Sequence, residues 1–392
     1  MSAPSLQAAA GNAPQRLQIP SLDGIRAASF LLVFLAHAGL EKWVPGYLGL
    51  TFFFFLSGYL ITTLLRQEAE RTGGIDLRRF FIRRVLRIFP PFYVVLGLAF
   101  ALAALGVLRG AGRLDGWTFQ VLHLTNYYIV RSGWWEGIAP GTWVYWSLAV
   151  EEHFYLAFPF LYLHLRRSMA SARGQALVLL GLCAAVLAWR CWLVFGLEAP
   201  KDRLYVATDT RIDSILFGCV LALWGNPALD ATAQSEARWK RVLFPAGLGL
   251  LLVSMIIRQP QYEQTLRYTL QGAALVPLFT VAVRYPHWGL LRVLNHRWAR
   301  WIGVHSYSLY LLHTVVIYGV RQWIPVATAL QGLIALAISL LLAIGIRHAV
   351  EAPCERVRRQ LSSGSSRRGS GEPAGTLGGS LPTVAPEGGP AA

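Results

Sequence analysis

The chain has 392 residues, of which 55% are hydrophobic and only 14% are charged, and its formal net charge is +16. Such an apolar composition over this length excludes a soluble globular domain and indicates a protein that crosses a membrane several times. The positive charge does not indicate nucleic-acid binding, because it is divided among clusters separated by apolar segments and forms no recognised binding motif.

Ten apolar segments have about the length that a helix needs to span a bilayer. They predict an all-α polytopic membrane protein with about ten transmembrane helices. Of the 36 Lys and Arg residues, 25 fall on one set of alternate loops and the termini, so the positive-inside rule places both termini in the cytoplasm. The expected spans are 22–40, 46–65, 88–108, 144–164, 175–195, 212–225, 242–258, 266–284, 301–321 and 327–349.

The two ends of the chain differ in composition from the apolar part at 21–360, which we expect to be one transmembrane domain. Residues 1–20 contain no apolar core of the kind that a secretory signal needs, and we expect them to be disordered. Residues 36–38 resemble a signal cleavage site, but the apolar segments that follow favour an uncleaved first span. Residues 361–392 are rich in Gly, Pro and Ser and predict a disordered low-complexity tail.

The first apolar segment has Arg26 near its start and His37 near its end, with ten mostly apolar residues between them. On an α-helix, eleven steps of about 100° make about three turns, so both side chains share a face about 16 Å apart along the axis. Asp23 is placed to pair with Arg26. A histidine within a span can serve only helix packing, but the shared face favours a site reached from both sides of the membrane.

An arginine cluster precedes the third span. It contains no lysine, and its members within ten residues are Arg78, Arg79, Arg83, Arg84 and Arg87. Such a cluster can simply set topology and contact lipid headgroups. However, a planar guanidinium matches the oxygens of a phosphate, whereas an ammonium is only a point charge. The cluster is therefore a candidate phosphate site on the cytoplasmic side.

The stretch WSLAVEEHFYLAFP, residues 146–159, places two carboxylates and a histidine inside an apolar span. Ser147 and Glu151 share one helical face, while Glu152 points elsewhere. One glutamate can form a structural salt bridge with a neighbouring helix. A carboxylate at this depth can also orient and charge-balance an imidazole, and His37 is available. We therefore expect Glu151 to orient the ring of His37.

Other kinds of site lack support in the sequence. The four cysteines have no metal-type spacing, and the chain contains no Walker loop, GxSxG or HExxH motif. We expect no bound metal and no resident cofactor.

Six motifs in order resemble those of the acyltransferase 3 family of integral-membrane O-acyltransferases, over about residues 19–360. The resemblance implies that an acyl group, most often acetyl, moves from cytoplasmic acyl-CoA to a hydroxyl of a surface polysaccharide, peptidoglycan, lipo-oligosaccharide or macrolide. It implies a bacterial cytoplasmic (inner) membrane location, with the lipid bilayer, acyl-CoA and a glycan or glycoside acceptor as partners. The motifs are LDGIRAASFLLVFLAH, GYLGLTFFFFLSGYLIT, FFIRRVLRIFPPFY, WSLAVEEHFYLAFP, TDTRIDSILFGCVLA and WIGVHSYSLYLLH.

The resemblance also implies roles for individual residues. Three motif pairs match: Arg26 with His37, Arg84 with Arg87, and Ser147 with Glu151. The implied catalytic residues are His37, Glu151 and Ser147. The implied acyl-CoA ligands are Arg26, Arg84, Arg87 and Arg83. The implied structural supports are Asp23, Arg211, Asp213, Tyr307 and His313.

In the mechanism implied by the resemblance, His37 removes the proton from the acceptor hydroxyl, and an acyl-histidine intermediate is an alternative. Thr51 stands where many family members carry an acidic residue, so no carboxylate role carries over there. Some members append an SGNH-type domain. The sequence contains none, so we expect transfer to a separate protein or directly to the final acceptor.

A second functional class remains open. Intramembrane Arg, His and Glu can also form a proton relay in a transporter of a glycolipid or natural product. The lack of an obvious inverted repeat between residues 22–195 and 212–350 disfavours this reading.

Overall fold

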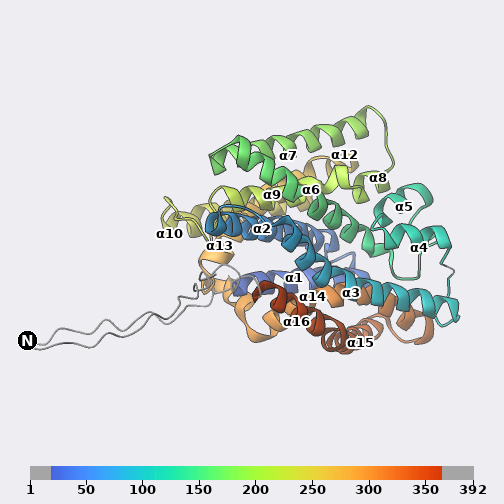
Figure 1. The fold of residues 1–392 in the computed structure, drawn as a ribbon. Helices are drawn as coiled ribbons and strands as arrows, with labels where there is room; N and C mark the ends of the chain where they lie inside the picture. Colours follow the sequence, from blue (N-terminus) through green and yellow to red (C-terminus); the bar gives the residue numbers. More distant parts are fainter. Residues whose placement is uncertain (1–18, 111, 364–392) are drawn as a thin grey trace, which may run out of the picture.

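The computed structural model describes residues 19–110 and 112–363, and within these ranges it contains helices and no β-strand (Figure 1). The predicted all-α class is confirmed. The long helices are α1 (Pro20–Leu35), α2 (Gly46–Thr72), α3 (Leu77–Ala104), α6 (Trp146–Ser168), α7 (Ala172–Phe195), α9 (Thr208–Leu223), α11 (Phe244–Ile256), α13 (Leu266–Arg284), α14 (Arg297–Trp323) and α15 (Thr328–Ile346). The short helices are α4 (Leu114–Val121), α5 (Thr125–Ser132), α8 (Lys201–Val206), α10 (Glu236–Arg238), α12 (Pro260–Gln264) and α16 (Ala352–Ser363). Short π and 3₁₀ segments are η1 (Ala36–Leu40), η2 (Trp143–Tyr145), η3 (Trp239–Leu243), η4 (Gly289–Asn295) and η5 (Arg347–Glu351).

Each predicted span falls on one of the long helices. Seven helical stretches in the described part of the chain are long and apolar enough to cross a membrane. They contain α1, α2, α3, α7, α11, α13 and α15. Helix α9 has 16 residues, and α6 and α14 carry several charged or polar side chains. Ten crossings with both termini in the cytoplasm therefore remain a prediction.

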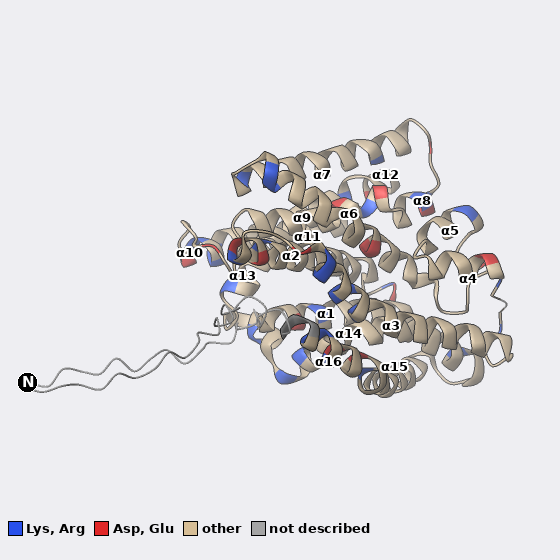
Figure 2. Cartoon of the chain, in the orientation of Figure 1, with Lys and Arg blue, Asp and Glu red and all other residues tan. Residues whose placement is uncertain are grey.

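Helix α3 begins well before the predicted span at 88–108. The Asp76 side chain caps it by accepting a hydrogen bond of 2.9 Å from the backbone N–H of Arg79. The arginine cluster is therefore part of the helix, whose later portion carries no charge (Figure 2). Of the predicted disordered ends, residues 1–18 and 364–392 lie outside the described residues.

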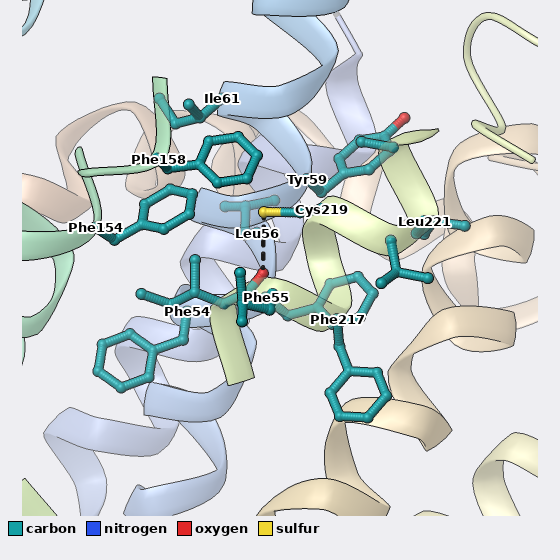
Figure 3. Close-up of a cluster of buried hydrophobic side chains, with 14 of the residues drawn as sticks. Phe54, Phe55, Leu56, Tyr59, Ile61, Phe154, Phe158, Phe217, Cys219 and Leu221 are labelled. Atoms are coloured by element: carbon teal, nitrogen blue, oxygen red, sulfur yellow. Dashed lines mark hydrogen bonds between the residues drawn. The ribbon is translucent and has the colours of Figure 1, made fainter. Parts of the chain in front are cut away.

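Close helix crossings form the apolar cores. Helix α2 packs on α9 at Gly58, where an added Cβ would lie 1.9 Å from the carbonyl oxygen of Ile215. Small residues permit this approach between membrane helices. Around the crossing lie aromatic side chains of α2, α6 and α9 (Figure 3). The Cys219 thiol also donates to the carbonyl oxygen of Gly58 at 3.6 Å. This crossing holds one wall of the cavity described below.

Helices α1 and α14 run in parallel and form the second core with α3 and α15 (Figure 1). Their contact is also tight, because a Cβ added at Gly303 would lie 1.9 Å from the carbonyl oxygen of Asp23. Helix α1 continues into the π-helical segment η1, which contains His37 and ends near Gly39 at a φ of 108°. The ideal α-helical geometry that the sequence analysis assumed between Arg26 and His37 therefore does not hold at the His37 end. Such π segments frequently occur at functional sites.

Candidate functional site

A cavity lies between α1, α2, α3, α6 and α14, and half of the predicted site residues line it. Its apolar lining comes from leucine, isoleucine and phenylalanine side chains of α2, α3 and α6. Its polar lining consists of Arg26, Ser57, Arg84, Arg87, Ser147, Glu151, Glu152, Tyr155, Ser306, Tyr307 and Tyr310. These residues come from five helices spread over the sequence, so the fold assembles the cavity.

Three guanidinium groups face this cavity. Arg26 forms the predicted ion pair with Asp23 at 2.9 Å. Arg84 lies over the rings of Phe80 and Tyr155, at 5.6 and 5.7 Å from their centroids. Neither Arg84 nor Arg87 has a carboxylate within salt-bridge distance in the described ranges. The cavity therefore presents two guanidinium groups without a salt bridge among the described residues, although the side chains of Glu151 and Glu152 line the same cavity.

Arg83, also expected to bind the donor, lies elsewhere. Its guanidinium pairs with Glu68 of α2 at 2.7 Å, and it does not line the cavity. A helix turns by about 100° per residue, so adjacent arginines face different neighbours. The structure therefore does not bring Arg83 to the cavity with Arg84 and Arg87, and the residue ties α3 to α2.

Glu151 lies in the cavity wall, in a closed hydrogen-bonded group. Ser57 donates to one carboxylate oxygen at 2.9 Å, and Tyr155 donates to the other at 3.2 Å. The Tyr155 hydroxyl is also 3.1 Å from Ser57 Oγ. Nothing in the sequence pattern singled out Ser57, which is 94 residues away from Glu151.

Ser147 lies one helical turn before Glu151 on α6. Its Oγ is 2.6 Å from the hydroxyl of Tyr310 on α14, and either atom can donate. Both hydroxyls also lie near the carbonyl oxygen of Val144, at 3.0 and 3.1 Å. Ser147 is buried, and this group joins α6 to α14 at one end of the cavity.

His37 lies beyond the cavity lining and makes a different contact from the one expected. Its Nδ1 is 3.0 Å from Nε2 of His313 on α14. The carboxylate oxygens of Glu151 are held by Ser57 and Tyr155 instead. The predicted pairing of Glu151 with His37 is therefore wrong, because the two side chains lie in different hydrogen-bonded groups.

The surroundings of the two histidines are aromatic. The His313 ring is fully buried and lies 5.9 and 6.3 Å from the ring centroids of Phe30 and Phe34. Arg321 donates a hydrogen bond of 2.8 Å to the carbonyl oxygen of His37, and sequence reasoning did not identify this arginine. Tyr310 connects this region to the cavity, because its hydroxyl meets Ser147 and its carbonyl oxygen lies 2.7 Å from His313 Nδ1.

Of the residues expected to have structural roles, Tyr307 lines the cavity and the others do not. Tyr307 also donates to the carbonyl oxygen of Ile88 at 2.8 Å. Asp213 is fully buried and accepts two hydrogen bonds from Arg190, at 2.9 and 2.7 Å. Arg190 was not among the predicted site residues, although an arginine inside the apolar segment 175–195 indicates a functional or structural site.

Arg211 is the second buried arginine of this region, and it lies 3.8 Å from the ring centroid of Tyr268. It stacks on aromatic side chains and forms no ion pair with Asp213, whose salt bridge is with Arg190. Thr51, the residue that departs from the family pattern, is buried and donates to Gln271 at 3.1 Å. It does not line the cavity.

One ionisable side chain outside the membrane spans has an unusual environment. His123 follows α4, and its ring stacks on Phe89 and Phe92. Burial, with a smaller contribution from the nearby His153, lowers its pKa to about 4, so it is neutral at physiological pH. No group of three His, Cys, Asp or Glu side chains within 19–110 and 112–363 is arranged to hold a metal ion.

Comparison with known proteins gives one family. A family model described as an acyltransferase domain matches residues 19–348. "Peptidoglycan O-acetyltransferase OatA" of Listeria monocytogenes is 30% identical over 318 residues, which are 77% of this chain and 50% of that protein. "Putative peptidoglycan O-acetyltransferase YrhL" of Bacillus subtilis is 31% identical over 320 residues, which are 76% of this chain and 48% of that protein. The chain spans about half the length of these relatives, and no solved structure matches it.

Proposed function

Because the chain belongs to the acyltransferase family whose model matches residues 19–348, we propose that it is a membrane O-acetyltransferase. In this proposal it moves an acetyl group from acyl-CoA to a hydroxyl of a glycan. The names of its relatives favour peptidoglycan or a similar polymer as acceptor. The proposal concerns the step that this chain performs, whether the acetyl group passes to a separate protein or directly to the final acceptor.

The observation that carries the proposal is the pair of cavity arginines that form no salt bridge within the described part of the chain. Arg84 and Arg87 line the same space as Arg26, Ser147 and Glu151. Guanidinium groups bind phosphate oxygens with charge-assisted hydrogen bonds, and coenzyme A carries several phosphates. The arginine end of the cavity therefore receives the nucleotide portion of the donor, and its leucine and phenylalanine lining receives the pantetheine arm.

His37 acts as the general base in this proposal. The acceptor hydroxyl loses its proton to the imidazole as its oxygen attacks the thioester carbonyl. The tetrahedral intermediate then collapses, the C–S bond breaks, and the thiolate of coenzyme A leaves and takes up a proton. The acceptor keeps the new ester. The cavity ends at Tyr310 and Ser147, next to the histidine pair, so the thioester would be delivered to the Tyr310 side.

The donor would come from the cytoplasm. Arg84 and Arg87 belong to the basic segment 66–87, for which the positive-inside rule predicts the cytoplasmic side. Reporter fusions after Arg109 and after Arg238 should lie on opposite sides of the membrane. Labelling of the 66–87 segment from outside intact cells would contradict the proposed donor side.

The function is tested by transfer from labelled acetyl-CoA to peptidoglycan fragments. Purified protein in detergent has no membrane potential, so a transporter driven by a proton gradient would show no transfer there. We expect acetyl ester to form with the wild type and not with His37→Ala. Absence of any transfer or donor hydrolysis by folded wild type, over a panel of glycan acceptors, would contradict the proposal.

A further inference from the structure

The hydrogen bond between His37 and His313 indicates which nitrogen of each ring carries a proton. His313 Nδ1 lies 2.7 Å from the backbone oxygen of Tyr310, and His37 Nδ1 lies 3.0 Å from His313 Nε2. A carbonyl oxygen only accepts hydrogen bonds, so His313 Nδ1 must carry a proton. The three groups therefore form a chain whose direction can be derived.

The surroundings of His313 favour the neutral form of its ring. Its side chain is fully buried between phenylalanine rings, and an ionised group there would lose its hydration without gaining a carboxylate partner. Arg321, which donates to the His37 carbonyl oxygen, adds a positive charge that opposes an imidazolium at His37 as well. In a neutral ring with Nδ1 protonated, Nε2 is an acceptor. His37 Nδ1 must then be the donor.

We propose that His313 is a positioning residue that holds His37 in the Nδ1–H tautomer, with the lone pair of Nε2 free to accept the acceptor's proton. This inference rests on the proposed function, because it assigns the basic atom of the same histidine. His313 thus has the orienting role that the sequence suggested for Glu151. A neutral imidazole replaces the carboxylate of a serine-hydrolase triad in that role.

The same side chain offers two informative substitutions. In His313→Gln, the terminal amide lies near the former Nε2, and its oxygen can still accept from His37 Nδ1. In His313→Asn, the shorter amide lies near the former Nδ1 and cannot reach His37. We expect His313→Asn to lower kcat about 10- to 100-fold with little change in KM for acetyl-CoA, by analogy with the partners that orient metal-ligating histidines. His313→Gln should recover a large part of that loss.

His305 provides a matched control on the same helix. Its Nδ1 also bonds a backbone carbonyl one turn earlier, that of Trp301 at 2.8 Å, and it is also buried. It has no histidine partner among the described residues and does not line the cavity. His305→Asn should therefore leave kcat near the wild-type value, which separates positioning from general loss of a buried histidine.

The direct readout is nitrogen NMR of ¹⁵N-histidine-labelled protein in lipid nanodiscs, with the His37 signal assigned from a His37→Asn sample. We expect the proton on Nδ1 of His37 in the wild type and a shift toward Nε2 in His313→Asn. A wild-type His37 protonated on Nε2 would overturn the inference, even if His37 proved essential. Wild-type turnover by His37→Ala would instead overturn the proposed function, whichever tautomer was found.

Discussion

The two ends of helix α1 lie in contrasting environments. At Arg26 the helix borders a cavity whose lining includes three guanidinium groups and two carboxylic side chains. About three turns later, His37 meets a neutral partner, His313, among phenylalanine rings. Charge is concentrated where a charged donor would bind, and hydrogen-bonded imidazoles lie where a proton would move. Helix α14 follows α1 past both regions, so relative motion of the two helices would disturb binding and chemistry together.

The largest effect should come from His37. His37→Ala should reduce transfer by about 100- to 10,000-fold, which is the usual contribution of a general base, while acetyl-CoA still binds. His37→Gln should be no better, because an amide does not accept a proton at neutral pH. Steady-state transfer assays measure the loss. Equal losses of folded protein and of activity would indicate a packing role instead.

The arginine end should respond through affinity. Arg84→Ala and Arg87→Ala should each weaken acetyl-CoA binding about 10- to 100-fold, since hydrogen bonds between charged groups contribute about 1.5–3 kcal/mol each. Arg84→Lys should recover only part of this loss, because an ammonium lacks the planar fork. Isothermal titration of detergent-purified protein measures the change.

Arg83→Ala is the matched control for these variants. It removes an arginine from the same turn of α3, but one that pairs with Glu68 outside the cavity. Its donor affinity should stay close to that of the wild type. An equal effect of all three alanine substitutions would mean that the cluster acts through its total charge on lipid or topology and not through a cavity.

Glu151 should have a smaller effect than His37. Glu151→Gln keeps an oxygen that accepts from Ser57 and loses the acceptor that faces Tyr155. With about one hydrogen bond lost, we expect transfer to fall about 5- to 10-fold. Single-turnover rates measure this, and a loss as large as that of His37→Ala would place Glu151 at the reacting atoms.

The smallest effect on chemistry should come from the helix crossing behind the cavity. Gly58→Ala would force α2 away from α9, and overpacking of this kind costs about 1–3 kcal/mol of stability. Gly97→Ala is the control, because nothing lies within 4 Å of an added Cβ there. Thermal unfolding in detergent compares them. If both glycines tolerated alanine equally, the crossing would not hold the cavity wall.

Local sequence patterns predicted the features that depend only on residues close together in the chain. Apolar runs located the helices, and the spacing of three residues located the pair of Asp23 with Arg26. Sequence motifs also named Arg84, Arg87, Ser147 and Glu151, which the fold brings into one cavity.

The missed features depend on how distant helices face one another. His37 and His313 are 276 residues apart, and Ser57 and Glu151 are 94 residues apart. Periodicity gives the faces of a single helix but not which face of another helix it meets. The rotation of α3 in the same way decides that Arg84 lines the cavity while Arg83 pairs with Glu68.

The central claim is that the cavity at the Arg26 end of α1 binds the donor and that His37 at the other end performs the chemistry. It is tested most directly by measuring donor binding and single-turnover transfer on the same purified samples. Three proteins suffice: the wild type, His37→Ala and the Arg84→Ala/Arg87→Ala double variant. We expect His37→Ala to bind acetyl-CoA nearly normally and to transfer almost none, whereas the double variant should bind weakly and transfer at a near wild-type rate once saturated. A well-folded His37→Ala protein that transfers at the wild-type rate, or a double variant with unchanged donor affinity, would contradict the account.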